Sequence, residues 1–175
     1  MKNRMNYSAF FSLIVPLFLL LSLKTTAQEK VNISAGFGFA EMLNLGIRFQ
    51  HKQSQIGFSV GSFPVKDESI ISVSGDYFYH FAGSSKHSER RPWFARGGLN
   101  YTRDETKASI DNFVFFNLRI GRDFNLSKKF GIGLDGGINI FLYQKAIVKD
   151  PNAWFTGEWD TPVFPSLGVA LFYRI

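Results

Sequence analysis

Apolar and polar residues alternate with a period of two along most of the chain after Lys30. Such alternation is typical of extended strands, in which successive side chains point to opposite faces. Polar turns separate the alternating segments, and no helical periodicity competes with them. The pattern predicts eight strands of roughly ten residues, over residues 31–40, 43–50, 56–61, 71–81, 93–102, 116–121, 130–142 and 166–175.

An even number of consecutive strands predicts an all-β fold, the eight-stranded antiparallel up-and-down β-barrel. In a soluble, lipocalin-like barrel the apolar face points inward, whereas in a transmembrane barrel it points outward. The polar face of this chain consists mainly of Gly, Ser, Asn and Ala, whereas a water-facing wall usually carries long Lys and Glu side chains. Because small side chains fit the narrow lumen of eight strands, the sequence favours a transmembrane barrel, with a soluble barrel as the alternative.

Aromatic residues test the same two alternatives, because membrane barrels carry an aromatic girdle at each interface. We take the lower end of the barrel as the end at which the chain enters, and we expect it to face the periplasm. The aromatic residues expected at the lower end are Phe49, Tyr77, Tyr79, Phe81, Trp93, Phe124, Phe130 and Tyr173. Those expected at the upper end are Phe37, Phe39, Phe63, Tyr101, Phe113, Tyr143 and Phe164. The positions between them are mostly Val, Ile and Leu, and this sorting again favours a membrane barrel.

The N-terminal segment has the three-part pattern of a secretory signal peptide. Two basic residues precede an apolar run at 9–23, and small residues follow it at Thr25 and Ala27. The pattern predicts a signal peptide over residues 1–27 and a barrel domain over residues 28–175. A membrane anchor is the alternative, but a proline interrupts the run, and a spanning helix needs about 20 apolar residues.

Composition and charge exclude several classes of function. The net charge of +6 falls to +3 once the signal peptide, with three basic residues and no acidic one, is removed. That balance is too weak to indicate a nucleic-acid partner. The chain has no cysteine, and its three histidines have no metal-ligand spacing, so we expect neither a metal site nor a cofactor. The aromatic fraction of 17% and charged fraction of 19% argue against disorder.

The alternating strands and the last strand together resemble small outer-membrane β-barrels: OmpX-like proteins, the OmpA transmembrane domain and the outer-membrane β-barrel families of Bacteroidetes. In such families the last strand carries a signal for the barrel-assembly machinery, and Gly168, Leu171 and Tyr173 are similar to that signal. The final Ile175 departs from the usual Phe. The resemblance implies export to the bacterial outer membrane and contact with its lipid and lipopolysaccharide.

Five charged residues fall on the predicted inner face near the middle of their strands. They are Arg48, Asp76, Arg96, Arg119 and Asp135. Their distances from the turns predict that Asp76 lies beside Arg96 and that Arg119 lies beside Asp135 on neighbouring strands. Because buried charges need partners, we expect a charge network that closes the lumen. A gated or ion-conducting path is the alternative, disfavoured because eight strands leave no open channel.

The longest predicted upper loop, residues 144–161, contains Trp154, Phe155 and Trp159 beside three acidic residues. Exposed aromatic residues often mark binding surfaces, so this loop is a candidate site for a sugar, a peptide or an envelope protein. The alternative is that these rings belong to the aromatic girdle at the upper interface.

Enzymatic chemistry has little support in the sequence. A resemblance to the lipid A deacylases among small barrels would require a His-x-Ser motif on a strand, with an acidic partner. His80 is followed by Phe81, and His87, Ser88 and Glu89 all lie in one polar loop, which does not preorganise a nucleophile. We therefore expect a non-enzymatic outer-membrane barrel with a structural or surface-interaction role. The alternatives are an accessory subunit of an export or uptake complex, a narrow porin-like channel, and a lipid A-modifying enzyme.

Overall fold

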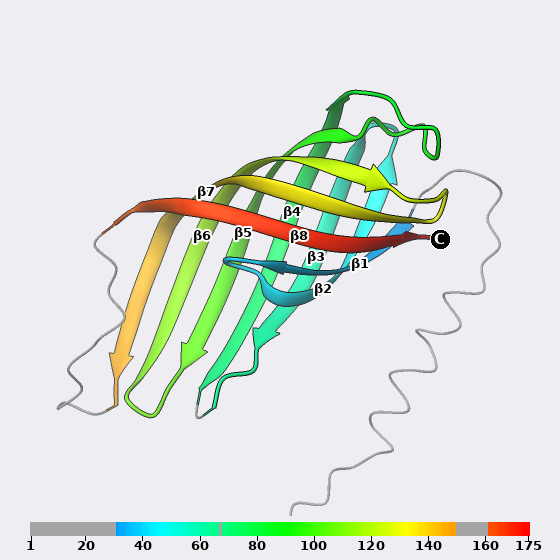
Figure 1. The fold of residues 1–175 in the computed structure, drawn as a ribbon. Helices are drawn as coiled ribbons and strands as arrows, with labels where there is room; N and C mark the ends of the chain where they lie inside the picture. Colours follow the sequence, from blue (N-terminus) through cyan, green and yellow to red (C-terminus); the bar gives the residue numbers. More distant parts are fainter. Residues whose placement is uncertain (1–30, 67, 150–160) are drawn as a thin grey trace, which may run out of the picture.

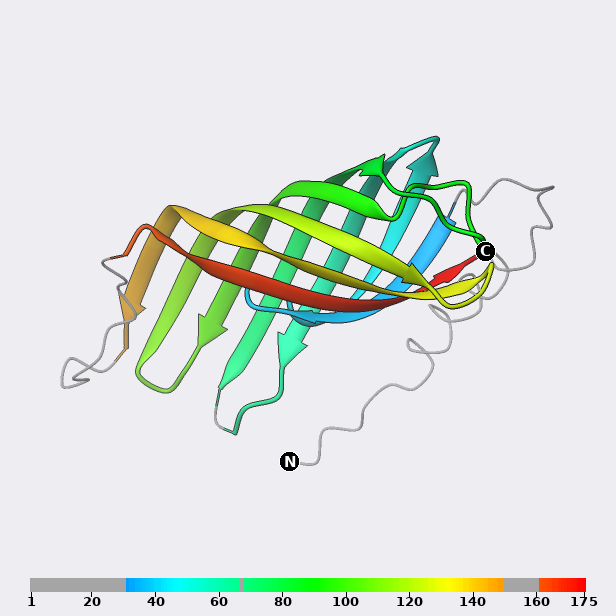
Figure 2. The ribbon, with the colours of Figure 1, turned by 45° about the horizontal axis from the view of Figure 1, so that its top comes forward.

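A computed structural model describes residues 31–66, 68–149 and 161–175. These residues form a closed barrel of eight antiparallel strands, which pair in chain order before β8 pairs with β1 (Figure 1). Figure 2 shows β8, in red, beside β1, in blue. The predicted fold class, an eight-stranded antiparallel up-and-down barrel, is therefore confirmed. The strands are β1 (Val31–Gly38), β2 (Met42–His51), β3 (Ser54–Phe63), β4 (Ser69–Ala82), β5 (Trp93–Glu105), β6 (Ser109–Asn125), β7 (Phe130–Val148) and β8 (Val163–Arg174).

The strands are less uniform in length than the alternation predicts. They range from 8 residues in β1 to 19 in β7. The predicted strand at 116–121 extends in both directions, and a turn at residues 106–108 replaces the longer connection predicted between it and the strand at 93–102. The alternation is lost at residues 113–116, which are all apolar, but the backbone ladder between β5, β6 and β7 continues through them. Among the described residues, no helix is long and apolar enough to span a membrane.

The apolar face of the strands is the outer face of the barrel, as the sequence predicts. Leu45 and Leu167 are 69% and 72% exposed, and Leu134, Ile138 and Val169 also point outward. All eight aromatic residues predicted for the lower end are exposed on this wall. The buried polar residues lie inside, and they include Asn32, Ser34, Gln55, Ser72, Ser74, Asn100, Asn117, Asn139 and Ser166.

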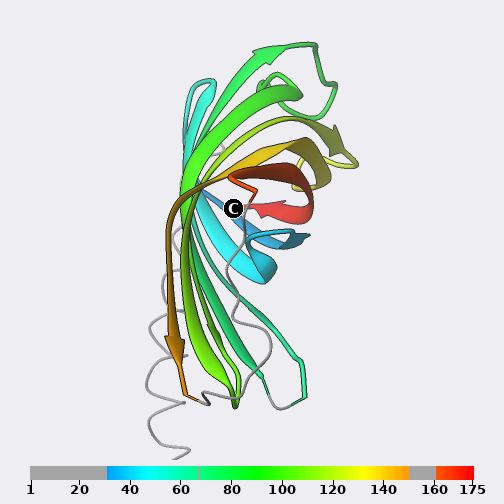
Figure 3. The same cartoon turned by 90° about the vertical axis from the view of Figure 1, so that its left-hand side faces the viewer.

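The β1–β2 hairpin is short, and its turn folds into the barrel. Figure 1 shows this hairpin ending well before the neighbouring ends of β4 to β7, and Figure 3 shows it on the concave side of the long strands. Ala40 and Glu41 in the turn are both 2% exposed. The carbonyl oxygen of Ala40 accepts hydrogen bonds from Ser72 Oγ at 3.0 Å and Thr102 Oγ1 at 3.3 Å. Hydrogen bonds from β4 and β5 thus anchor the turn to the inner wall.

The turn approaches β3 so closely that no side chain fits between them. A Cβ atom on Gly61 would lie 1.9 Å from the carbonyl oxygen of Glu41, well inside van der Waals contact. Glycine at residue 61 is therefore a condition for the inward position of the turn.

We predict that Gly61→Ala destabilises the barrel by about 1–3 kcal/mol, the usual cost of overpacking a close contact. The measurement is the urea midpoint of unfolding of the refolded protein. Gly75→Ala is the matched control, because a Cβ atom there would meet only the ring of Phe58, at 3.7 Å. Equal midpoints for the two variants would contradict the prediction.

Candidate functional site

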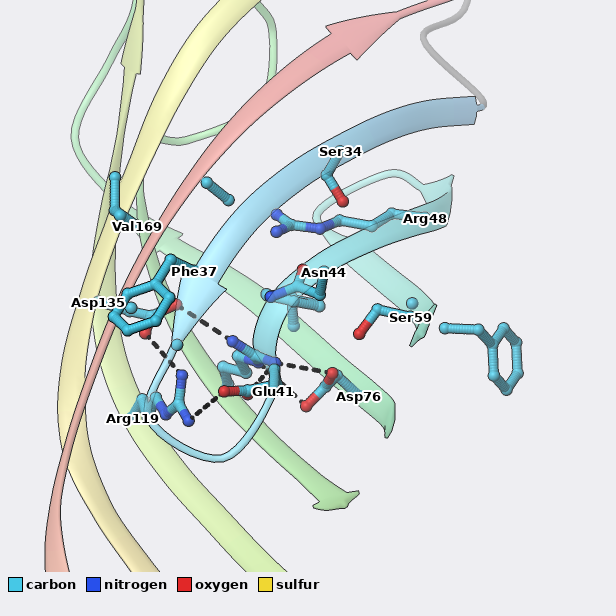
Figure 4. A pocket seen from close by; sticks show the side chains of 17 residues that line it. Ser34, Phe37, Glu41, Asn44, Arg48, Ser59, Asp76, Arg119, Asp135 and Val169 are labelled. Carbon is cyan, nitrogen blue, oxygen red and sulfur yellow. Dashed lines mark hydrogen bonds and ion pairs between the residues drawn. The ribbon is translucent and has the colours of Figure 1, made fainter. Parts of the chain in front are cut away.

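Four of the five charged residues predicted for the interior meet in one cluster, together with Glu41 from the β1–β2 turn. Arg96 on β5 is its centre. Figure 4 labels the other members, Glu41, Asp76, Arg119 and Asp135. Its Nη2 atom lies 2.6 Å from Glu41 Oε1 and 2.8 Å from Asp76 Oδ2, and its Nη1 atom lies 3.3 Å from Asp135 Oδ2. Asp76 also receives a 3.0 Å hydrogen bond from Arg96 Nε, so that pair is bidentate.

Arg119 on β6 completes this central charge cluster. Its Nη2 atom lies 2.8 Å from Glu41 Oε2 and its Nη1 atom lies 3.1 Å from Asp135 Oδ1. Glu41 and Asp135 therefore each bridge the two arginines. The predicted neighbours, Asp76 with Arg96 and Arg119 with Asp135, are in contact, although each pair is diagonal rather than directly opposite in the strand register.

Glycine lies directly opposite most of these charged residues. Gly98 pairs with Asp76, and a Cβ atom there would lie 2.2 Å from the Asp76 carboxylate. Gly168 pairs with Asp135, and a Cβ atom there would lie 2.5 Å from Asp135 Oδ1. The space that a long charged side chain needs in a narrow lumen thus comes from glycine on the next strand.

Arg48 lines the same cavity but is not part of the central charge cluster. No hydrogen bond or ion pair joins it to another described residue, and its guanidinium carbon lies 4.4 Å from the ring centre of Phe78. Figure 4 shows the guanidinium pointing toward Ser34 and Asn44. Arg48 therefore lies on the inner face, as predicted, but it forms no ion pair with the other predicted charges, because the three carboxylates are already bound to Arg96 and Arg119.

Glu41 is the residue of the cluster that the alternation pattern missed, because that pattern assigns it to a solvent-facing turn. The balance of charge among the predicted interior residues could have indicated that an acidic residue was missing. The five predicted interior charges comprise three arginines and two aspartates, so one further acid was required for neutrality. Only the fold shows that a turn residue supplies it.

A second interior cluster lies nearer the lower end. Arg90 and Asp123 are joined at 2.6 Å, and both side chains are 1% exposed. Gln50 accepts a 2.7 Å hydrogen bond from Arg90 Nη1. Arg174 lies over the Phe172 ring at 4.8 Å and donates to Asn125 Oδ1. Continuing the alternation of β6 from Arg119 through Gly121 would have placed Asp123 on the inner face.

Toward the upper end the interior is aromatic rather than polar. Phe115 and Phe141 lie 4.7 Å apart between ring centres, and Phe164 lies 5.1 Å from Phe141. Phe113 stacks on Phe115 at 5.8 Å and is 8% exposed. The prediction that Phe113 and Phe164 belong to the outer girdle is therefore wrong. A run of four apolar residues at 113–116 carries no information about which face points inward.

The remaining predicted residues divide between the last strand and the upper loop. Leu171 and Tyr173 point outward from β8, and both are 46% exposed, while Gly168 faces Asp135. Trp154, Phe155 and Trp159 lie outside the described residues, as does the predicted signal peptide at 1–27.

The inner face also carries a buried histidine, His80. His80 Nδ1 donates to the Arg91 carbonyl oxygen at 2.8 Å, and its Nε2 atom lies 3.2 Å from Gln55 Oε1. Within the described ranges, no three His, Cys, Asp or Glu residues are grouped so that they could hold a metal ion. The cavity between the central charge cluster and Arg48 has a volume of about 30 Å³, comparable to one water molecule.

Comparison with solved structures agrees with this architecture. The chain is similar to the N-terminal β-barrel domain of OprF from Pseudomonas aeruginosa, with a TM-score of 0.53 and 16% sequence identity. The alignment covers 83% of this chain and 98% of that domain. No known protein family matches the sequence, and no curated protein matches it. The similarity therefore establishes a shared barrel fold.

Removing the Glu41 charge should destabilise the barrel, because Arg96 and Arg119 would lose the carboxylate that bridges them. For Glu41→Gln we expect a loss of about 3 kcal/mol of unfolding free energy, in the range found when one partner of a buried ion pair is removed. Urea unfolding followed by tryptophan fluorescence measures it. The control is Glu89→Gln, which removes the same charge from an exposed loop residue. A Glu41→Gln variant as stable as this control would show that the bridge contributes no stability.

An acidic group lies at the upper rim, beyond the central charge cluster and past Tyr101 on β5. Asp104 pairs directly with Asp111 in the register, and each has a buried carboxylate oxygen with no hydrogen-bond partner. Burial, the hydrogen bond to Glu68 and the nearby Glu68 and Asp111 charges raise the pKa of Asp104 from 3.8 to about 6. The raised pKa means that the folded barrel binds this proton more tightly than the unfolded chain.

Asp104 should therefore favour folding at about pH 4 and lose that contribution as the pH rises through about 6. We predict that, between these pH values, the urea midpoint of the wild type falls relative to that of Asp104→Asn. The measurement is the midpoint of unfolding at a series of pH values at constant ionic strength. An unchanged pH profile in the variant would contradict the assignment.

Proposed function

We propose that this protein is an integral β-barrel of the bacterial outer membrane, with a closed lumen and a non-enzymatic role. The role would be structural, or one of surface interaction through the upper loops. The observation that carries the proposal is the distribution of side chains, which is the reverse of that in a water-soluble barrel. Large apolar side chains cover the outside, and paired charges occupy the inside. A water-soluble protein has no reason to expose so much apolar surface, whereas hydrocarbon solvates it.

The distribution of exposed side chains supports a membrane-spanning orientation. Exposed aromatic residues lie at both ends of the outer wall, and aliphatic residues such as Leu45, Val60 and Leu118 lie between them. Aromatic rings favour the two interfaces of a bilayer, and aliphatic side chains favour its core. Backbone pairing between β1 and β8 over residues 32–38 and 168–174 also closes the barrel, and closure removes strand edges that hydrocarbon could not hydrogen-bond.

Three interior features support a lumen closed to solutes. The central charge cluster crosses the middle of the lumen, the Arg90–Asp123 pair lies below it, and the rings around Phe115 lie above it. The small central cavity also leaves little space for a hydrated ion. A narrow channel would require these contacts to separate.

The proposal includes no catalytic role, because no activated nucleophile is found among the residues that the structure describes. The ring of His80 lies between Gln55 and the Arg91 carbonyl, and neither of these is a nucleophilic side chain. An accessory role in an export or uptake complex is compatible with the same barrel. Envelope proteins that copurify in mild detergent would identify it.

The proposal predicts that the exported chain fractionates with outer membranes and is extracted only by detergent. Unheated samples should migrate differently from boiled samples on a denaturing gel, because a closed barrel resists unfolding by the detergent. Planar bilayers containing the purified protein should show no steady conductance. Recovery of a folded protein in the soluble fraction without detergent would overturn the membrane assignment, and steady conductance would overturn the closed lumen.

A further inference from the structure

The outer wall carries a polar row just beyond its upper tyrosines. Arg103 on β5 pairs with Asn112 on β6, and Asn112 pairs with Lys145 on β7. Arg103 lies two residues past Tyr101, and Lys145 lies two residues past Tyr143, which places the row about 7 Å farther along the strands. Both tyrosines are exposed, at 43% and 52%. Three adjacent strands therefore place this row of polar groups just beyond the upper tyrosines, and Ile110 and Ile147 occupy the next outward positions on β6 and β7.

After the hydrogen bonds around this row are formed, its residues still have N–H groups that can donate to a ligand. Tyr101 donates its hydroxyl to Asn112 Oδ1 at 2.7 Å, so the amide nitrogen of Asn112 remains as a donor. Glu105 accepts from Arg103 Nη2 at 2.9 Å and from Lys149 Nζ at 2.7 Å, so two cations share its charge. Arg103, Asn112 and Lys145 thus present a guanidinium, an amide and an ammonium side by side.

The charge of the surrounding outer surface has the same sign. Arg103, Lys107, Lys145 and Lys149 lie at this end of β5 to β7, and Glu105 is the acidic residue among them. The neighbouring acids Asp104 and Asp111 lie one strand position away from the row, on the inner face.

Cations at the lower end of the wall are arranged differently. Arg122 lies over the rings of Trp93 and Phe124 at 5.4 Å and 5.2 Å, and Lys129 lies 5.7 Å from the ring centre of Tyr173. Their charges therefore face aromatic rings. The upper row instead faces the position that lipid headgroups would occupy.

We propose that Arg103, Asn112 and Lys145 bind a phosphate group of a phosphorylated, lipid A-type glycolipid in the outer leaflet. This inference rests on the proposed membrane-spanning function. A guanidinium binds phosphate oxygens in a bidentate manner, and an adjacent ammonium and amide supply further donors. Exposed apolar residues on the same strands, such as Leu99 and Leu142, extend from this row toward the bilayer centre, where the acyl chains of such a lipid lie.

The experiment compares lipid retention by three forms of the full exported chain. They are the wild type, the double variant Arg103→Gln/Lys145→Gln, and the control Lys86→Gln/Lys128→Gln. The control removes two exposed charges from lower turns, so its net charge equals that of the double variant. Each form is refolded into phosphatidylcholine vesicles containing diphosphorylated lipid A, extracted in mild detergent, and analysed by native mass spectrometry.

We expect the wild type and the control to retain lipid A, and the double variant to retain about 25-fold less, since each cation near an anionic lipid surface contributes about fivefold in affinity. Dephosphorylated lipid A should be retained poorly by all three forms, and Arg103→Lys/Lys145→Arg should restore retention. Phosphatidylglycerol in place of lipid A should be retained less than lipid A by the wild type.

Two kinds of failure are distinguishable. Equal retention by the double variant and the control, or equal retention of phosphorylated and dephosphorylated lipid A, would overturn the site and leave the membrane barrel intact. Wild-type retention of phosphatidylglycerol equal to that of lipid A would overturn the glycolipid as its ligand. Failure of the wild type to enter vesicles, measured by the absence of a heat-modifiable band, would overturn the proposed function and this inference with it.

Discussion

The two arginines buried most deeply in the middle of this barrel need carboxylate partners there, and much of the interior is arranged around that requirement. Arg96 and Arg119 occupy the middle of a narrow lumen, where an uncompensated guanidinium would be strongly destabilising. Three carboxylates surround them, and each lies on a different part of the barrel wall or turn. The resulting ion pairs connect β4, β5, β6 and β7 through side chains as well as through backbone hydrogen bonds.

The same requirement explains the irregular geometry of the first hairpin. Because β1 ends at Gly38, its turn lies level with the arginines rather than above the barrel. The turn can then carry Glu41 into the lumen, provided that the facing position on β3 is glycine. The short hairpin, the glycine on β3 and the buried Glu41 thus depend on one another.

Residues on the outer wall are constrained by the medium around the barrel rather than by specific contacts with other side chains. Any large apolar side chain suits a hydrocarbon-facing position, and any small or paired polar group suits the inner face. Many sequences satisfy these two conditions, which accounts for a shared fold with the OprF barrel domain at 16% identity. Distinctive chemistry should therefore lie at the rims, where the register aligns particular side chains, as it does for Arg103, Asn112 and Lys145.

Alternation alone determined the number of strands, their antiparallel order and the identity of most inward and outward residues, because the two-residue period of a strand is local. Distances along the chain were sufficient to pair Asp76 with Arg96 and Arg119 with Asp135, since consecutive hairpins bring such positions together. The tertiary structure alone decided that Glu41 enters the lumen and that Arg48 has no carboxylate partner. It also placed Phe113 and Phe164 inside. These outcomes depend on how far a turn folds inward and how wide the lumen is at each height, which are properties of the closed barrel rather than of any single strand.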